Sequence, residues 1–284
     1  MPELPEVETI RRQLDTVLPG KEIKDVVVFK DKSFGGNSSS LVGKEIERVR
    51  RRAKIVEIWF RGWEKLVVIH LKMTGQLVYL ADDGMRVVGG HPSADWVADL
   101  PNGHTRVVWD FTDGSKLFFN DMRIFGWMKI VDREKYEKER MGVPDVTDKE
   151  FDFKYLKLVL SKSGRAVKLV LTDQNKIGGI GNIYANDSLY LAGVSPVRKA
   201  NSLGDREIRE LRKAVVEVIL RGIKFGGSSA ADEKYVNAFG QKGKYQEHFL
   251  VYEKAGQVCK RDGEKIRRGR LGGRSMFYCP KCQN

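Results

Sequence analysis

The chain begins MPELPEVETIRRQLDTVL (residues 1–18), a stretch that combines a helical pattern with an unusual start. Pro2 and Pro5 suit the first turn of a helix, where a backbone N–H is not needed. The three carboxylates between residues 3 and 8 suit the same turn, because they face the positive end of the helix dipole. Apolar residues recur at spacings of three and four until Pro19-Gly20, which predicts a helix over residues 3–18.

The same residues allow a chemical interpretation. If Met1 is removed, Pro2 becomes a free secondary amine at the tip of the helix, next to Glu3 and one helical turn from Glu6. A well-started helix with no chemistry at its tip is the simpler interpretation. The first eighteen residues do not distinguish the two, so the rest of the chain has to.

Length and charge narrow the class of protein. A chain of 284 residues with 41% hydrophobic content is long enough for two globular domains. Its 51 Lys and Arg against 38 Asp and Glu give a net charge of +13, which favours a polyanionic partner such as nucleic acid over a basic protein of unrelated function. The chain lacks both a long apolar run and an apolar segment after a basic start. We therefore expect no membrane span and no secretory signal, and a cytoplasmic, nucleoid-associated protein.

Residues 22–131 show short β-type runs separated by turn signals such as Asp83-Gly84 and Asp113-Gly114. Strands this numerous at this spacing predict a sandwich or a barrel. The polar, glycine-containing segment 81–104 is expected to be a loop on that domain. The predicted strands are residues 23–29, 54–60, 65–71, 76–80, 105–111 and 116–120.

Beyond residue 131 the pattern becomes helical again. DREKYEKER (132–140) has no apolar face and is expected to be a linker or a solvated helix. Apolar stripes at helical spacing follow between residues 151 and 160 and between residues 208 and 223. Residues 225–246 carry glycines and polar groups without periodicity, and a stretch of this length inside a compact region is usually functional or mobile.

All three cysteines lie near the end of the chain, in the pattern Cys259-x2-Asp262-x16-Cys279-x2-Cys282. An odd, clustered set does not resemble a disulfide framework. Two pairs of ligands at this separation are typical of a zinc ribbon, and a carboxylate oxygen can replace a thiolate on zinc. We predict one structural Zn²⁺ on these four residues. A ribbon held by packing alone is the alternative, and His248 is a less favoured substitute ligand.

A glycine-rich run marks a candidate phosphate site. Gly178, Gly179 and Gly181 precede a predicted helix, and Asn182 lies near its start. Glycines allow the backbone to approach an anion closely, and a helix N-terminus supplies N–H donors. An ordinary turn would show the same run, but the basic composition favours the phosphate interpretation.

Several bulky or basic residues lie at predicted turns. Met73 lies in HLKMTG, Arg123 and Phe125 in NDMRIFGW, and Lys54 in RRAKIV. Met and Phe at strand ends are most often core residues. However, an enzyme that acts on a base inside duplex DNA must extrude the base and fill the gap, which needs an apolar wedge and a hydrogen-bond donor.

Together these motifs resemble the formamidopyrimidine-DNA glycosylase family over essentially the whole chain. The resemblance is carried, in the family's order, by PELPEVET (2–9), HLKMTGQL (70–77), NDMRIFG (120–126), QNKIGGIGNIYANDSLY (174–190) and GRSMFYCPKCQ (273–283). Leu4-Pro5 favours the branch that acts on oxidised purines over the related endonuclease-VIII branch.

The resemblance implies an α+β fold of two domains. It implies an N-terminal catalytic β-sandwich (1–131) opened by the N-terminal helix, a linker (132–146), a helical domain with a helix–two-turn–helix motif (147–247) and a zinc finger built on a β-hairpin (248–284). It further implies a monomer that binds double-stranded DNA containing oxidised bases or abasic sites in the cleft between the domains. Residues 225–246 are then expected to cover the everted base.

The family's catalytic roles fall on four residues of this chain. The resemblance implies that Pro2 is the nucleophile, Glu3 the proton-transfer carboxylate and Glu6 a support of the site. It implies that Lys54 contacts the phosphate beside the lesion and assists. Met73, Arg123 and Phe125 are expected to fill the space left by the extruded nucleotide. The full set of expected DNA contacts is Met73, His91, Arg106, Arg123, Phe125, Lys176, Asn182 and Arg274.

The implied activity explains the N-terminal proline. The family is one of bifunctional DNA glycosylase/AP lyases of base excision repair, which excise 8-oxoguanine and formamidopyrimidines and then carry out β,δ-elimination. Attack on the sugar needs an unprotonated amine, and α-amino groups titrate near about 7.7–8.0 where lysine titrates near about 10.4. A secondary amine gives an iminium ion with the sugar, which acidifies the neighbouring sugar proton.

Two positions depart from the family pattern, and two other functions stay open. Asp262 stands where the second cysteine of the finger is expected, and Ile124 stands where a second arginine often follows Arg123. A preference for oxidised pyrimidines is the same-class alternative. A non-catalytic damaged-DNA-binding protein is the other, and retention of Met1 would favour it because an amide would consume the Pro2 amine.

Overall fold

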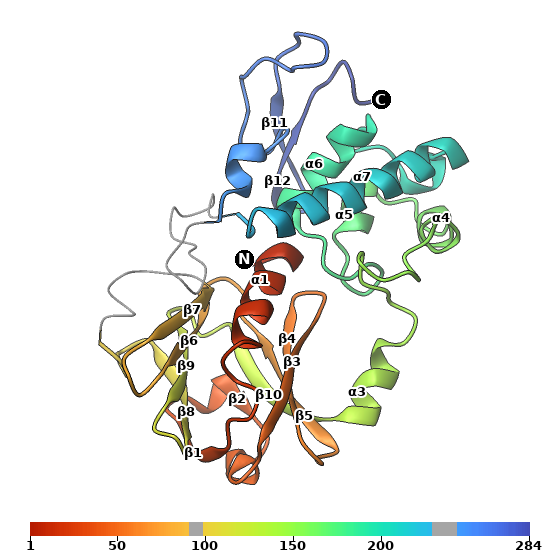
Figure 1. Ribbon diagram of the computed structural model, residues 1–284. Helices are drawn as coiled ribbons and strands as arrows, with labels where there is room; N and C mark the ends of the chain where they lie inside the picture. The colour runs from red at the N-terminus through yellow and green to blue at the C-terminus, as the bar shows by residue number, and fades with distance from the viewer. Residues whose placement is uncertain (91–98, 229–242) are drawn as a thin grey trace. The chain divides into compact units, whose positions relative to one another are not determined.

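The computed structural model describes residues 1–90, 99–228 and 243–284, and its contacts divide the chain into two compact units (Figure 1). The first unit comprises Met1–Met141 and Phe225–Gln246, and the second comprises Gly142–Lys224 and Glu247–Asn284. The predicted α+β fold of two domains is confirmed. The individual domain boundaries stay a prediction; residues 225–246, expected with the helical domain, group here with the first unit.

The described part of the first unit contains two five-stranded sheets, ordered β1-β8-β9-β6-β7 and β2-β10-β5-β4-β3. The first sheet is built from β1 (Ile23–Val28), β8 (Thr105–Phe111), β9 (Lys116–Asp121), β6 (Gly75–Leu80) and β7 (Arg86–Gly90). The second is built from β2 (Phe34–Gly35), β10 (Trp127–Asp132), β5 (Lys65–His70), β4 (Ile55–Phe60) and β3 (Ile46–Arg52). The pairings are antiparallel, apart from the parallel pair of β2 and β10.

The period-2 pattern of the strands builds one core between the two sheets. On β9, Leu117 and Phe119 point into this core, while Phe118 lies in a separate apolar cluster. The core also takes Ile58 from β4 and Ile69 from β5, so both sheets contribute their inner faces to it. The predicted β-sandwich is therefore confirmed.

Residues 133–140 form a helix that packs against the second sheet. Asp132 caps α3 (Arg133–Arg140) by accepting the Lys135 N–H. The buried Tyr136 packs with Trp59 in a small apolar cluster, and its hydroxyl donates to Glu57 Oε1 at 2.8 Å. Burial and the neighbouring Glu57 carboxylate raise the pKa of Tyr136. The sequence interpretation of a linker or solvated helix missed this single buried aromatic contact.

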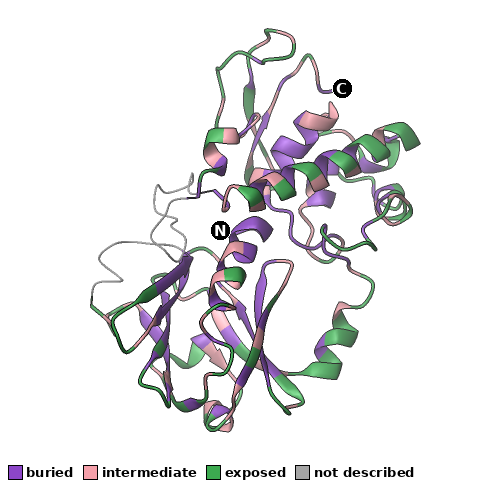
Figure 2. Cartoon of the chain, in the orientation of Figure 1, coloured by how far each residue is buried: buried purple, intermediate pink, exposed green. Residues whose placement is uncertain are grey.

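The N-terminal helix α1 (Leu4–Leu14) joins the edges of the two sheets. It contacts β7, at one end of the first sheet, and β3, at one end of the second. Most of its residues are buried, as the purple colour of α1 shows (Figure 2). The helix ends four residues earlier than predicted, because the Thr16 and Val17 N–H groups bond to the carbonyls three residues back, Gln13 and Leu14, in a tighter turn.

The loop expected over residues 81–104 contains strand β7, so that prediction was wrong for Arg86–Gly90. The pattern was hard to detect because the strand ends in two glycines. Gly89 packs against α1 so closely that an added Cβ would lie 2.8 Å from Ile10 Cγ1. Gly90 has a φ of +121° and faces the backbone of β6. Close packing, rather than a turn, explains these glycines.

The second unit packs helices against a β-hairpin. Its helices are α4 (Phe153–Ser161), α5 (Val167–Leu171), α6 (Asn182–Ala192) and α7 (Asp205–Lys224), with a short 3₁₀ turn at Ala200–Ser202. Other 3₁₀ turns lie in the first unit at Asp31–Ser33 and Ser38–Leu41, and at the boundary of the two units at Tyr245–His248. The hairpin consists of β11 (Arg267–Leu271) and β12 (Arg274–Tyr278). Asn186 of α6 accepts the Phe277 N–H of β12 at 2.9 Å, and Lys168 of α5 donates to the Ser275 carbonyl at 2.7 Å. The helices therefore fix the hairpin.

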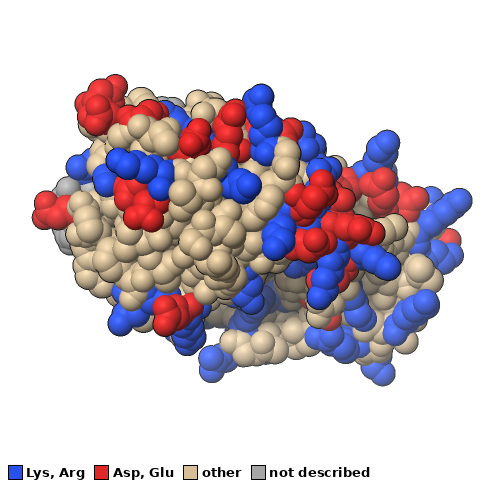
Figure 3. All heavy atoms as spheres, turned by 90° about the horizontal axis from the view of Figure 1, so that it is seen from below, with Lys and Arg blue, Asp and Glu red and all other residues tan. Residues whose placement is uncertain are grey.

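Charge on the first unit's visible face is mixed. Figure 3 shows Lys and Arg side chains standing among Asp and Glu side chains, with uncharged areas between them. The net charge of +13 is therefore not gathered into one patch on the face shown. Among the described residues, no helix combines the length and the apolar character needed to cross a membrane.

A buried carboxylate ties α1 to β3. Glu8 accepts hydrogen bonds from Arg11, from Arg12 Nε at 2.8 Å and from Arg51 Nε at 2.9 Å. Arg51 also donates to the Ala53 carbonyl at 3.2 Å. Burial alone would raise the pKa of Glu8, but the three arginines outweigh burial and lower it from 4.5 to about 2.

Glu8→Gln should destabilise the protein in a pH-dependent manner. We expect it to lower the free energy of unfolding at neutral pH by about 2 kcal/mol, because it leaves the buried Arg51 and the partly buried Arg11 without their anion. The folded-state pKa of Glu8 lies below 4.5, so its stabilisation is complete above about pH 4.5 and is lost as the pH falls toward 2. Urea unfolding should show the difference between variant and wild type shrinking over that window.

Glu47→Gln is the matched control, because Glu47 pairs with Arg48 at 3.2 Å on the surface. Such a pair contributes about 0–1 kcal/mol. A Glu8→Gln effect that is as small as that of Glu47→Gln, or that does not change with pH, would contradict the role of Glu8.

Candidate active site and metal centre

The residues at the start of α1 are buried and hydrogen-bonded to one another. Pro2, Glu3 and Glu6 are all buried. Glu3 is the N-cap of α1, and its backbone N–H donates to Glu6 Oε2 at 2.8 Å as part of a capping box. The structure thus contains the well-capped helix of the simpler sequence interpretation. The capping box also fixes the side chains of Glu3 and Glu6, which follow Pro2 by one and four residues.

The second oxygen of the Glu6 carboxylate binds a segment far away in the sequence. Ser228 N–H donates to Glu6 Oε1 at 2.7 Å, and both groups are buried. Gly227 packs over Glu6 with a φ of +80°, and an added Cβ would lie 2.8 Å from Glu6 Cγ. Only glycine fits this combination of backbone conformation and close contact. Glu6 therefore joins the N-terminal helix to the segment that leads into residues 229–242, which lie outside the described residues.

Lys54 lies in the turn between β3 and β4 and is buried, with 3% of its surface exposed. Its neighbour His70, at the end of β5, accepts the Lys72 N–H on Nδ1 at 3.0 Å. Burial lowers the pKa of His70, and the charges of Lys72, Lys54 and Arg140 lower it further, to about 3. His70 is therefore neutral at physiological pH, with its proton on Nε2. Lys54, Lys72 and Arg140 thus place positive charge near a neutral His70 that can donate a hydrogen bond. Such an environment favours the binding of an anion.

Three predicted wedge residues stand on two adjacent turns. Met73 lies in the turn between β5 and β6, and Arg123 and Phe125 lie in the turn between β9 and β10. Met73 is 41% exposed and Phe125 is 48% exposed, so neither is a core residue. The Arg123 guanidinium stacks 4.8 Å from the centre of the Phe125 ring. The structure brings the three side chains to the surface of one unit.

Arg106 and His91, two of the predicted DNA contacts, differ in what the structure shows of them. Arg106 is buried and donates to the Asp121 carbonyl at 2.7 Å and to the Gly103 carbonyl at 3.2 Å. In this structure the Arg106 side chain therefore bonds to backbone carbonyls, and its contact with DNA stays a prediction. His91 lies outside the described residues.

In the second unit, a side chain shapes the glycine-rich run before α6. Gln174 accepts the Gly179 N–H at 3.1 Å and donates to the Ile180 carbonyl at 2.7 Å. Gly179 has a φ of +99°, which a residue with a side chain rarely adopts. Asn182 begins α6, and its buried Oδ1 accepts no hydrogen bond within the part of the chain described. Lys176, on the same run, is half-buried.

Arg274 follows the tight turn of the hairpin. Leu271 pairs with Arg274, and Gly272 and Gly273 between them both have positive φ, as the preferred two-residue hairpin turn requires. Arg274 is exposed. The hairpin also carries a shallow hollow of about 440 Å³, lined by Arg268, Gly269, Arg270, Gly273 and Ser275.

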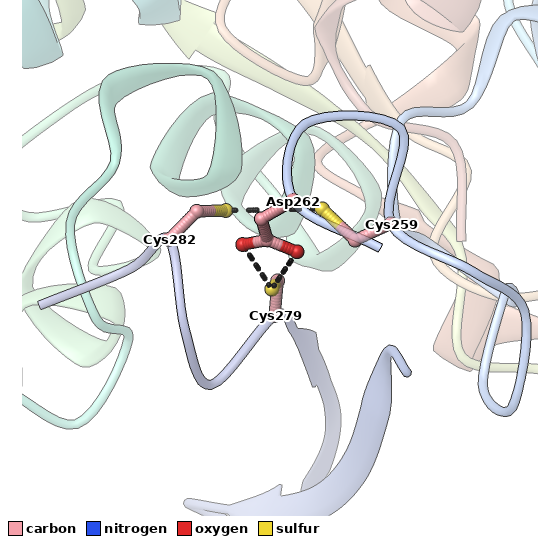
Figure 4. A group of neighbouring side chains, drawn as sticks. All are labelled: Cys259, Asp262, Cys279 and Cys282. Atoms are coloured by element: carbon pink, nitrogen blue, oxygen red, sulfur yellow. Dashed lines mark hydrogen bonds between the residues drawn. The ribbon is translucent and has the colours of Figure 1, made fainter. Parts of the chain in front are cut away.

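The four predicted metal ligands come together (Figure 4). One ligand atom from each of Cys259, Asp262, Cys279 and Cys282 lies within 4.8 Å of every other. The Cys259 and Cys282 sulfurs are 3.9 Å apart, and Cys279 Sγ lies 3.2 Å from Asp262 Oδ2. Figure 4 shows the Asp262 carboxylate directed at the three sulfurs. These residues could hold one metal ion.

Hydrogen bonds outside the cluster fix its side chains. The Tyr190 hydroxyl of α6 lies 3.3 Å from Cys259 Sγ, and Gln283 Oε1 accepts the Cys279 N–H at 2.8 Å. Asp262 Oδ1 accepts the Glu264 N–H at 2.9 Å, which fixes the carboxylate with both oxygens toward Cys279 Sγ. Such contacts orient metal ligands in proteins.

Sequence reasoning did not single out several residues that organise these sites. His70 lies inside the quoted motif HLKMTG, and its position beside Lys72 was a usable signal. Asp121 and Thr74 flank the wedge residues in the sequence but carry no chemical signature of their own. Ser228 and Gly227 could not be found, because their contact with Glu6 spans more than two hundred residues of chain.

The comparisons with known proteins agree with this architecture. The model of the formamidopyrimidine-DNA glycosylase N-terminal domain matches residues 1–128, and the model of the formamidopyrimidine-DNA glycosylase H2TH domain matches residues 143–234. The formamidopyrimidine-DNA glycosylases of Carboxydothermus hydrogenoformans and Pelotomaculum thermopropionicum are 40% and 37% identical to the chain. Each alignment covers all of this chain and at least 99% of the relative. The chain therefore belongs to the formamidopyrimidine-DNA glycosylase family.

Solved structures give the same result. A Lactococcus lactis enzyme of this family, a variant in complex with DNA containing Fapy-dG, matches with a TM-score of 0.86 and 29% identity over the whole of both chains. Wild-type enzyme from the same organism, bound to DNA containing an oxidised pyrimidine, matches with a TM-score of 0.84 and 30% identity, again over both whole chains.

Gly227→Ala should separate the Glu6 contact from simple backbone strain. Both Gly226→Ala and Gly227→Ala place a side chain at positive φ, which costs about 1 kcal/mol. At Gly226 an added Cβ meets nothing within 4 Å, so that variant is the matched control. At Gly227 the Cβ also collides with Glu6, which should cost about 1–3 kcal/mol more. Thermal unfolding and amide exchange at Ser228 measure both effects, and equal losses in the two variants would contradict the close contact.

Proposed function

We propose that this chain is a bifunctional DNA glycosylase/AP lyase that excises oxidised purines, such as 8-oxoguanine and formamidopyrimidines, from duplex DNA. The observation that carries the proposal is the buried N-terminus of α1, where Pro2 lies beside Glu3 and within a turn of Glu6. Family membership and the similarity to enzymes bound to damaged DNA support it.

The proposed reaction uses the Pro2 nitrogen after Met1 has been removed. The nitrogen attacks C1′ of the damaged nucleotide, and the glycosidic bond breaks as the base leaves with a proton. Opening of the sugar gives an iminium ion, which makes the C2′ proton acidic and allows loss of the 3′ phosphate and then of the 5′ phosphate. Glu3 is the proposed proton carrier. Glu3 directly follows Pro2 in the sequence and is the N-cap of α1, which supports this role.

Glu6 is proposed to hold the site together rather than to react. Both of its oxygens accept backbone N–H groups, from Glu3 and from Ser228. These bonds fix the Glu3 backbone and hold the segment before residues 229–242 beside it. That segment belongs to the stretch proposed to cover the everted base.

The remaining site residues are proposed to bind and distort DNA. Lys54, beside the neutral His70, is proposed to contact the phosphate next to the lesion. Exposed Met73 and Phe125, with Arg123 stacked on the Phe125 ring, suit the filling of the space left by an extruded nucleotide. The other proposed DNA contacts are His91, Arg106, Lys176, Asn182 and Arg274.

Borohydride reduction tests the covalent step. With protein from which Met1 has been removed and an 8-oxoguanine duplex, we expect a trapped protein–DNA complex. Pro2→Gly should reduce trapping strongly, because it replaces the secondary amine, and Glu3→Gln should slow base excision. Pro5→Ala is the matched control, since Pro5 lies in the same first turn but has no free nitrogen. Absence of trapping by the processed wild-type protein would count decisively against the proposed chemistry.

A preference for oxidised pyrimidines is the second candidate. It is favoured by the similarity to a Lactococcus lactis enzyme solved with DNA that contains an oxidised pyrimidine. Single-turnover excision of 8-oxoguanine opposite cytosine, compared with excision of thymine glycol, distinguishes the two. We expect the purine lesion to be removed faster.

The cysteine cluster is proposed to hold one structural zinc ion. Tetrahedral thiolate ligands at about 2.3 Å from zinc place two sulfurs about 3.8 Å apart, and the Cys259 and Cys282 sulfurs lie 3.9 Å apart. A carboxylate oxygen binds zinc at about 2.0–2.2 Å, so Asp262 can complete a set of three thiolates, although structural zinc sites more often use only Cys and His. Cys259, Asp262, Cys279 and Cys282 would hold the ion, which would stabilise the β11–β12 hairpin and so present Arg274.

Metal analysis tests the zinc proposal. We expect about one zinc per chain after rinsing with a weak chelator. Asp262→Ala should weaken zinc binding by about tenfold or more, because it removes a ligand. Glu264→Ala is the matched control, since only its backbone contacts the cluster residues. Metal-free wild-type protein with an intact fold would overturn the proposal.

A further inference from the structure

Asp121 lies at the end of β9 and is completely buried. Its carboxylate accepts hydrogen bonds from several backbone N–H groups of the following turn. Oδ2 accepts the Phe125 N–H at 2.8 Å and the Gly126 N–H at 2.6 Å. Oδ1 accepts the Arg123 N–H at 3.2 Å. Arg123 and Phe125 have exposed side chains, and the backbone N–H groups of both residues donate to the Asp121 carboxylate.

The same carboxylate also holds the neighbouring turn. The Thr74 hydroxyl donates to Asp121 Oδ1 and accepts the Arg123 N–H at 3.1 Å. Thr74 directly follows Met73, the exposed residue of the β5–β6 turn. One buried acid and one hydroxyl thus connect the turn that carries Met73 to the turn that carries Arg123.

Surrounding residues leave the Asp121 carboxylate little freedom. The Asp121 backbone carbonyl accepts Arg106 Nε at 2.7 Å. At Gly126, an added Cβ would lie 2.8 Å from Phe119 Cζ and 3.1 Å from Asp121 Oδ2. The turn is therefore closed tightly over the carboxylate, and a neutral amide in its place would put an NH₂ group against backbone N–H donors.

We infer that Asp121, acting through Thr74, is the positioning residue for the wedge formed by Met73, Arg123 and Phe125. The inference rests on the proposed function, because only an enzyme that extrudes a nucleotide needs a wedge of fixed geometry. A displaced wedge slows the extrusion of a paired damaged base. It has much less effect at a preformed abasic site, where no base pair has to be broken.

Single-turnover rates on two substrates test this inference. One substrate carries 8-oxoguanine opposite cytosine, and the other carries a preformed abasic site. For Asp121→Asn and Thr74→Val we expect excision to fall about tenfold or more, while strand cleavage at the abasic site changes by less than about threefold. Thr74→Ser keeps the hydroxyl and should restore excision. Hydrogen exchange in the peptide 120–128 should become faster in Asp121→Asn and Thr74→Val.

Glu57→Gln is the matched control, because Glu57 is another buried carboxylate of the same unit, bonded to Tyr136 and Trp59. It should leave the ratio of excision to abasic-site cleavage unchanged. If both rates fall in parallel in Asp121→Asn and Thr74→Val, or neither falls, Asp121 is a structural residue only and the inference is wrong. If instead the wild-type protein has neither activity, the proposed function is wrong, and the inference that rests on it is wrong as well.

Discussion

The Glu6 carboxylate is the contact on which the rest of the first unit's chemistry depends. Glu6 accepts the Glu3 N–H on one oxygen and the Ser228 N–H on the other, and Gly227 packs against its side chain. A buried carboxylate is stable only when hydrogen bonds replace its hydration. The backbone groups that supply those bonds come from the two segments that the proposed reaction needs side by side. The hydrogen bonds of a single buried acid thus connect the start of α1 to the segment at Ser228.

Buried acids that bind backbone N–H groups recur in the molecule. Asp121 accepts backbone N–H groups of the turn after β9, and Asp187 of α6 accepts the N–H groups of residues 250–252. Each of these acids joins a regular element to a loop that has no regular pattern of its own. Loops fixed in this way can present functional side chains with the precision of the sheets and helices behind them. Glu8 has a different role, since its partners are arginine side chains, of which Arg51 connects α1 to β3.

The sequence predicted the elements better than their contacts. Periodicity and turn residues were sufficient for the N-terminal helix, apart from its end, and for strands β1, β4, β5, β6, β8 and β9, whereas β2, β3 and β10 were not among the predicted strands. The spacing of the cysteines and Asp262 was sufficient for the four-residue metal cluster. Strand β7 was missed because its glycines reflect packing against Ile10 and the β6 backbone, which local patterns do not encode. The bond between Glu6 and Ser228 could not be predicted for the same reason. The roles of Pro2, Lys54 and the wedge residues came from the family resemblance, and the geometry supports them only as proposals.

The central claim is that the N-terminal imino nitrogen, held at the capped start of α1, forms the bond to the damaged sugar. Mass-spectrometric mapping of the reduced protein–DNA adduct, after digestion of both components, tests this claim most directly. The account predicts that the sugar remnant lies on Pro2 at the end of the processed chain. A remnant on Lys54, or on any other side chain, with Pro2 unmodified would contradict it.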